Sequence, residues 1–176
     1  VNGNYIVYWP VATVADFSHR LASFDRGRSL GPERLTVEFR QGLATGTIVG
    51  GDYRIVDVLG QGGFGLTYKG FDTRLGSQVA IKEYFPADMA LREDGTSVRV
   101  RSTREEGVFG WGRDKFLEEA RTLARFRHSN IVRVARLFEE NNTAYMVLDF
   151  EQGPSLAEWR ANLGRAPRQD ELDRIA

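Results

Sequence analysis

The chain has 176 residues, of which 41% are hydrophobic and 27% charged, as expected for a globular domain with a core of its own. Lysine plus arginine and aspartate plus glutamate both number 24, so the net charge is zero and a whole-protein attraction to nucleic acid or anionic membrane is excluded. The absence of cysteine and the presence of only two histidines exclude disulfides, thiolate sites and a histidine-built metal centre.

The sequence carries no targeting or membrane signal. No apolar run approaches the roughly 18 residues of a membrane helix, and the N-terminus lacks a basic region followed by an apolar one. We therefore expect a cytoplasmic protein with no membrane segment and no nucleic-acid partner.

The first 50 residues are the hardest part of the chain to interpret. Residues 5–9 and 35–39 have the character of short strands, and residues 14–24 carry a weak helical stripe. We treat residues 1–50 as an N-terminal extension of unclear structure, without an assigned function.

After this extension, apolar segments and turn signals alternate regularly along the chain. Apolar and β-branched residues between turn signals predict five strands, at residues 53–59, 66–71, 78–83, 131–138 and 143–150. Asp94 and Gly95 between alternating residues predict a small hairpin. Apolar residues at helical spacing, with acids early and arginines late, predict a helix over residues 114–127.

Two further helices are expected near the end of the chain. One covers residues 155–163 with Ser155 as its cap, and another begins near Asp170. The predicted fold class is α+β, with a five-stranded antiparallel sheet and one main helix. We expect residues 51–153 to form one lobe and residues 154–176 to begin another.

A glycine-rich loop lies between the first two predicted strands. Residues 60–65 read G-Q-G-G-F-G, a G-x-G-x-x-G pattern. A dinucleotide fold needs a helix after this loop, and a Walker loop needs a lysine that residues 65–67 lack, so neither alternative fits. A glycine hairpin between strands can instead lay its backbone amides over phosphate oxygens; a flexible hairpin without a ligand remains the alternative.

A lysine ends the third predicted strand. Lys82 follows Val79, Ala80 and Ile81, and a lysine in such an apolar strand is unusual unless its charge has a partner. A snorkelling edge lysine is the alternative. A carboxylate on the predicted helix, Glu119 or the competing Glu118, could hold it extended beneath the loop.

At this point the ordered motifs resemble the ATP-binding lobe of a protein kinase of the Ser/Thr type, in particular a bacterial subgroup. The resemblance covers residues 52–160 and rests on the glycine loop, V-A-I-K at 79–82, F-L-E-E-A at 116–120, H-S-N-I-V at 128–132 and the hinge-like A-Y-M-V-L-D-F at 144–150. The F-L-E-E-A match selects Glu119 over Glu118. The segment from Lys82 to Glu119 is longer than is usual in the family.

The resemblance implies a role for each matching residue. Lys82 would contact the α- and β-phosphates of ATP, with Glu119 orienting it. The other implied nucleotide contacts are Leu59, Gly60, Gly62, Gly63, Phe64, Gly65, Thr67, Ala80, Leu148, Asp149 and Glu151. Among these, the backbone of residues 62–65 would cover the phosphates, and Leu59, Thr67 and Ala80 would roof the adenine. Leu148 would be the gatekeeper, and the backbone carbonyl of Asp149 and amide of Glu151 would bond the edge of the adenine. Thr67 stands where the family usually has valine.

The motifs that carry the family's catalytic residues do not occur in this sequence after the hinge-like segment. No H-R-D or D-F-G follows Phe150, so the protein ligands of Mg, which is expected with ATP, are absent. We expect this chain alone to be inactive and to need a second lobe, encoded downstream or supplied by another kinase lobe. The alternatives are a free-standing lobe that binds nucleotide, dimerises or regulates, and a degenerate lobe that binds none. The protein substrate is not specified.

Overall fold

The computed structural model describes residues 41–128, 131–153 and 156–172, with side chains of 156–158 excepted. These residues belong to two compact units, each of which is considered by itself. The larger unit includes residues 41–127 and 133–150, and the smaller includes residues 151–153 and 156–172. The strands predicted at 5–9 and 35–39, the helix at 14–24 and the Ser155 cap lie outside the described residues.

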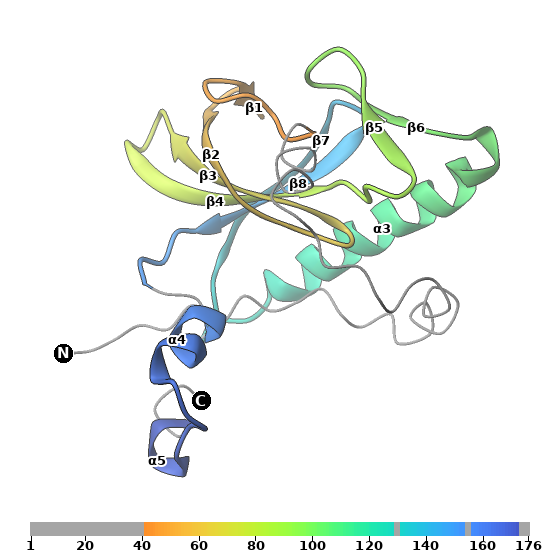
Figure 1. Cartoon of the computed structure of the whole chain (residues 1–176). Helices are drawn as coiled ribbons and strands as arrows, with labels where there is room; N and C mark the ends of the chain where they lie inside the picture. Colours follow the sequence, from red (N-terminus) through yellow and green to blue (C-terminus); the bar gives the residue numbers. More distant parts are fainter. Residues whose placement is uncertain (1–40, 129–130, 154–155, 173–176) are drawn as a thin grey trace. The chain divides into compact units, whose positions relative to one another are not determined.

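A single antiparallel sheet forms the body of the larger unit (Figure 1). Its strands lie in the order β1-β2-β3-β4-β8-β7, and their bounds are β1 Ile48–Val49, β2 Tyr53–Gly62, β3 Gly65–Asp72, β4 Ser77–Tyr84, β7 Val134–Glu140 and β8 Thr143–Asp149. The five predicted strands and the α+β class are confirmed. The two-residue β1 was not predicted, and β7 begins three residues later than expected.

The burial of the strands explains their sequence patterns. On β3, buried residues alternate with half-buried ones, whereas the first five residues of β8 are all buried. Tyr145 of β8 shares one side of the sheet with the buried Glu83, and Met146 shares the other side with Lys82 and α3. β8 is therefore covered on both sides, and such strands read as continuous apolar runs. Residues before β2 also belong to this core, because Leu43 and Val49 are buried in it. The compact lobe therefore includes part of the predicted extension.

One long helix, α3 (Glu106–Leu123), runs beside the sheet (Figure 1). It follows a short 3₁₀ turn, η1 (Thr103–Glu105), and its rings Phe109 and Phe116 pack on Tyr84 of β4 with centroid separations of 5.1 and 6.0 Å. The predicted span of 114–127 was wrong at both ends. Three glycines in the first two turns interrupt the apolar pattern there, and the helix ends at Leu123.

A two-stranded hairpin precedes this helix, as predicted around Asp94 and Gly95. Its strands are β5 (Ala90–Arg92) and β6 (Val98–Val100). The amide of Val98 donates to the carbonyl oxygen of Asn141 at 2.8 Å. Asn141 begins the left-handed turn between β7 and β8, so the small hairpin is joined to the large sheet.

The smaller unit contains two described helices, α4 (Leu156–Leu163) and α5 (Gln169–Leu172). Gly164 has a positive φ of 61° directly after α4, as is common where a helix ends. Arg165 then binds the carboxylate of Glu171 with two hydrogen bonds, of 2.9 and 2.6 Å. These contacts fix the connection between the two helices.

Candidate functional site

The glycine loop forms the turn of the β2–β3 hairpin. Gly60 pairs with Thr67, and Gly62 pairs with Gly65 at the tip. The carbonyl oxygen of Phe64 accepts a hydrogen bond from the amide of Phe85, at 3.1 Å, while the Phe64 side chain is exposed. The loop backbone is thus attached to the end of β4 and is not a free hairpin.

The glycines of this loop are not equivalent. A Cβ added at Gly60, Gly62 or Gly63 would meet no atom within 4 Å, and none of the three has a positive φ. A Cβ at Gly65 would lie 2.2 Å from the carbonyl oxygen of Glu83. Gly65 is therefore required by the contact between β3 and β4, whereas the other three leave open space for a group of another molecule.

Lys82 lies on the next strand, opposite Thr67 of β3 and Met146 of β8. Directly paired residues of an antiparallel sheet point to the same side, and so does Tyr84, two residues further along β4. Because Tyr84 packs on α3, Lys82 lies on the side of the sheet that faces this helix. Its side chain is half-buried.

The two candidate partners of this lysine have different surroundings. Glu118 is exposed, and one of its oxygens lies 2.6 Å from the Lys115 amine on the same helix. Glu119 is half-buried and interacts electrostatically with Lys82. Among the described residues, the structure therefore brings Glu119 and not Glu118 toward Lys82, although the two charges are not in ion-pair contact.

Burial dominates the electrostatics of this pair. It lowers the pKa of Lys82, and the attraction of Glu119 offsets only part of that shift. Burial likewise raises the pKa of Glu119, against the attraction of Lys82. Each charge is thus only partly compensated by the other, so an additional anion near Lys82 would favour its protonated form.

Three of the residues predicted to contact adenine, Thr67, Ala80 and Leu148, lie on the same side of the sheet as Lys82. Ala80 pairs with Lys69 on one neighbouring strand and with Leu148 on the other, in step with the Thr67–Lys82 pair. Leu59 lies where the β2–β3 register shifts, and it is 41% exposed. An exposed leucine here leaves apolar surface next to the glycine hairpin.

Two basic residues contact the end of β8, and neither was among the predicted site residues. Arg133 forms two hydrogen bonds with the carboxylate of Asp149, of 2.9 and 3.1 Å, and its carbonyl oxygen accepts from the Asp149 amide. The Lys69 amine lies 5.2 Å from the centre of the Phe150 ring. Glu151 belongs to the smaller unit, so its predicted contact stays a prediction.

Neither a metal centre nor a membrane span can be identified in the described part of the chain. Residues 41–128, 131–153 and 156–172 contain no cluster of three or more histidine or carboxylate side chains that could hold a metal. None of the helices in these ranges combines the length and apolarity that crossing a membrane requires.

Comparison with known proteins identifies relatives of the same kind. The chain is 32% identical over 111 residues to a probable serine/threonine-protein kinase of Clostridium acetobutylicum, covering 63% of this chain and 14% of the relative. It is 30% identical over 113 residues to the serine/threonine-protein kinase PksC of Streptomyces coelicolor, covering 62% and 17%. The chain thus spans less than a fifth of these two relatives.

A solved structure and a family model agree with these relatives. The apo form of PpkA-294 superimposes with a TM-score of 0.66 at 39% identity, covering 69% of this chain and 43% of that one. The family model described as the protein kinase domain matches residues 53–173. With its antiparallel sheet, its long helix α3 and this match, the chain belongs to the protein kinase domain family and is similar to bacterial serine/threonine kinases.

Proposed function

We propose that residues 51–153 form the ATP-binding lobe of a protein kinase that phosphorylates serine or threonine with Mg-ATP. The observation that carries the proposal is the half-buried Lys82 amine on the helix-facing side of the sheet, only partly compensated by Glu119. A triphosphate supplies the negative charge that this arrangement lacks. Relatives of this chain are serine/threonine kinases, which supports the same assignment.

The residues present fit the phosphate end of a nucleotide. Gly60, Gly62 and Gly63 carry no side chain and have open space beside them, so their backbone could approach phosphate oxygens closely. Lys82 would contact the α- and β-phosphates, and Glu119 would orient the lysine. No step is assigned to magnesium, because the described residues contain no cluster that could hold it.

The adenine end follows the strand register. Thr67, Ala80 and Leu148 share one side of the sheet, and exposed Leu59 adds apolar surface from β2. In the proposed site these side chains contact the base, and the backbone next to Asp149 bonds its edge. The Arg133–Asp149 pair would keep that backbone in place. The second lobe, the protein substrate and self-association stay predictions.

Thermal unfolding with and without Mg-ATP tests this proposal. A ligand present at 100 times its dissociation constant should stabilise the folded chain by about 2.7 kcal/mol. Lys82→Ala should abolish this response, whereas Lys115→Ala, which removes an exposed lysine of α3, should retain it. An unchanged response in Lys82→Ala would refute the phosphate role, and a wild-type chain indifferent to Mg-ATP would refute nucleotide binding.

A further inference from the structure

The residue directly after Lys82 is a fully buried carboxylate. Glu83 has 0% relative exposure and pairs with Leu66 and Tyr145 on the neighbouring strands. Because successive residues of a strand point to opposite sides of the sheet, Glu83 lies on the side away from α3. The amine and the carboxylate are thus one residue apart on β4 but in different environments.

Three groups from separate elements satisfy this carboxylate. The hydroxyls of Tyr68 and Tyr145 donate to its two oxygens at 2.5 and 2.9 Å, and a guanidinium nitrogen of Arg92 lies at 2.7 Å. Burial, followed by the neighbouring Glu83 charge, raises the pKa of both tyrosines, so both hydroxyls remain donors. β3, β8 and the small β5–β6 hairpin therefore converge on one side chain of β4.

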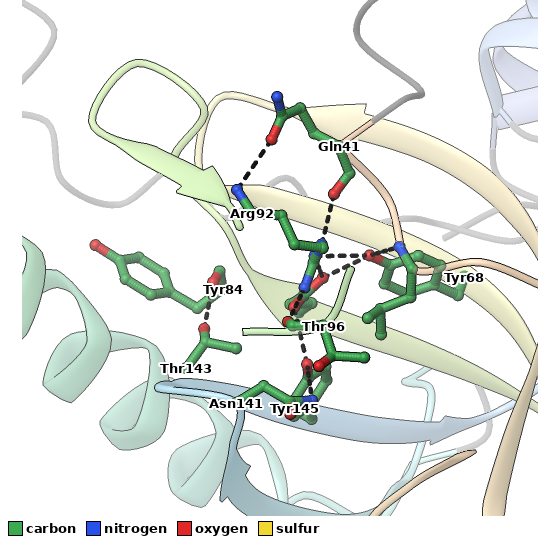
Figure 2. Close-up of polar contacts among 10 residues, drawn as sticks. Gln41, Tyr68, Tyr84, Arg92, Thr96, Asn141, Thr143 and Tyr145 are labelled. Atoms are coloured by element: carbon green, nitrogen blue, oxygen red, sulfur yellow. Dashed lines mark hydrogen bonds and ion pairs between the residues drawn. The ribbon is translucent and has the colours of Figure 1, made fainter. Parts of the chain in front are cut away.

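Arg92 forms further polar contacts, with Gln41 and Thr96, which Figure 2 shows. Its guanidinium donates to the carbonyl oxygen of Gln41 at 2.8 Å and to that of Thr96, and it lies 5.0 Å from the centre of the Phe85 ring. The Arg92 side chain is only 4% exposed. The hairpin thus places one buried and hydrogen-bonded cation against Glu83, the residue beside Lys82.

Stability alone is a weak reason for such a pair. Desolvating two charges offsets much of their attraction, and an apolar pair of similar volume often stabilises a fold as well. A buried pair with fixed hydrogen-bond directions instead favours one position of the groups that carry it. Here those groups are the end of β4, where the amide of Phe85 also bonds the glycine loop.

We propose that Glu83 and Arg92 are positioning residues for Lys82: the buried pair, reached from the β5–β6 hairpin, holds the end of β4 so that the lysine amine faces the phosphate site. The inference deepens the proposed function and rests on it for its consequence in nucleotide binding. It also assigns a role to the long segment between Lys82 and Glu119, which supplies Arg92.

Chemical labelling of the three lysines in the full chain tests the positioning directly, without nucleotide. The pH dependence of amine acetylation, resolved by mass spectrometry, gives a titration midpoint for Lys82, with Lys115 as internal reference. In Arg92→Met, loosening of β4 should let water reach Lys82 and move its titration midpoint upward, toward the ordinary value of a lysine amine. The midpoint of Lys115 should not move.

Arg101→Met is the matched control. Arg101 lies next to the same hairpin and donates to the carbonyl oxygens of Ala90 and Ala87, but it makes no contact with Glu83. It should leave the Lys82 midpoint unchanged. If Arg92→Met does not fold, Tyr145→Phe removes one hydroxyl donor to Glu83 and keeps the buried ring, and the same shift in a smaller amount is expected.

A second experiment measures nucleotide binding by the same variants. Arg92→Met should weaken Mg-ATP binding roughly tenfold, and in a Lys82→Met background it should have no further effect. If the variants lower stability while the Lys82 midpoint and Mg-ATP affinity stay as in wild type, Glu83 and Arg92 are merely structural and the inference is wrong. If the wild-type chain does not bind Mg-ATP, the proposed function is wrong instead. The labelling experiment would still decide whether Glu83 and Arg92 position Lys82.

Discussion

Gly65→Ala should lower the stability of the fold and Gly63→Ala should not, although both residues belong to the same glycine motif. A methyl group at Gly65 would lie 2.2 Å from the carbonyl oxygen of Glu83 and 3.3 Å from its carbon. This neighbour is backbone of the adjacent strand, so two strands must separate to admit the methyl group. Overpacking of this kind costs about 1–3 kcal/mol.

At Gly63 a methyl group would meet nothing within 4 Å, and the backbone there does not have a positive φ. Gly63→Ala should therefore leave stability unchanged or raise it by about 0.4–1 kcal/mol, because alanine restricts the unfolded chain. In the proposed site the same methyl group occupies space that phosphate oxygens need. Gly63→Ala should consequently reduce the stabilisation by Mg-ATP.

Urea unfolding followed by circular dichroism measures both effects, with the slope of the transition checking that the unfolded states are comparable. Each variant is measured with and without saturating Mg-ATP. Equal destabilisation by the two substitutions would show that the loop glycines share one structural role. A neutral Gly65→Ala would show that β3 and β4 are not as close as described, and the reasoning would fail.

Three further predictions concern the helix and the lysine. Glu119→Gln should weaken the Mg-ATP response in thermal unfolding while Glu118→Gln should not, because only Glu119 interacts with Lys82; equal effects would contradict the assignment. In α3, Gly110→Ala should stabilise the chain by about 0.5–1 kcal/mol, since helix propensity improves and no atom lies within 4 Å. Gly112→Ala should destabilise the chain, because the added methyl group would lie 2.2 Å from the hydroxyl oxygen of the buried Tyr84. The urea unfolding midpoints of the two glycine variants test both expectations. Burial lowers the pKa of Lys82 below its ordinary 10.5, so between the two values the unfolded chain binds more protons and stability rises with pH. Lys82→Met should remove that rise from urea midpoints measured at stepped pH, and a persisting rise would assign it to other groups.

The local parts of the fold could be predicted from the sequence because their signals are local. Strands β2, β3, β4 and β8 have strong apolar patterns between turn signals, and their predicted bounds agree to within three residues. The first two turns of α3 were missed because Gly107, Gly110 and Gly112 interrupt the helical stripe. Gly112 is there for packing, since it allows the helix to approach Tyr84.

The site was predictable to the extent that motif spacing reflects strand register. Lys82 and Thr67 are paired across β3 and β4. The periodicity of the sequence does not predict this pairing, but the length of the turn between the two strands determines it. The burial of Glu83 was not predictable. Its partners are 9, 15 and 62 residues away, and a glutamate in a strand is normally exposed. Only the three-dimensional convergence reveals that it is buried.

The adjacency of Lys82 and Glu83 has a consequence for how this strand can change. A shift of β4 by one residue in its pairing register would move each of its side chains to the other side of the sheet. With the strand displaced one way, the carboxylate would take the place of the amine in the proposed phosphate site. Displaced the other way, the amine would meet the buried guanidinium of Arg92. Each outcome would place like charges together, so a single insertion or deletion in β4 should be tolerated only when a second one restores the register.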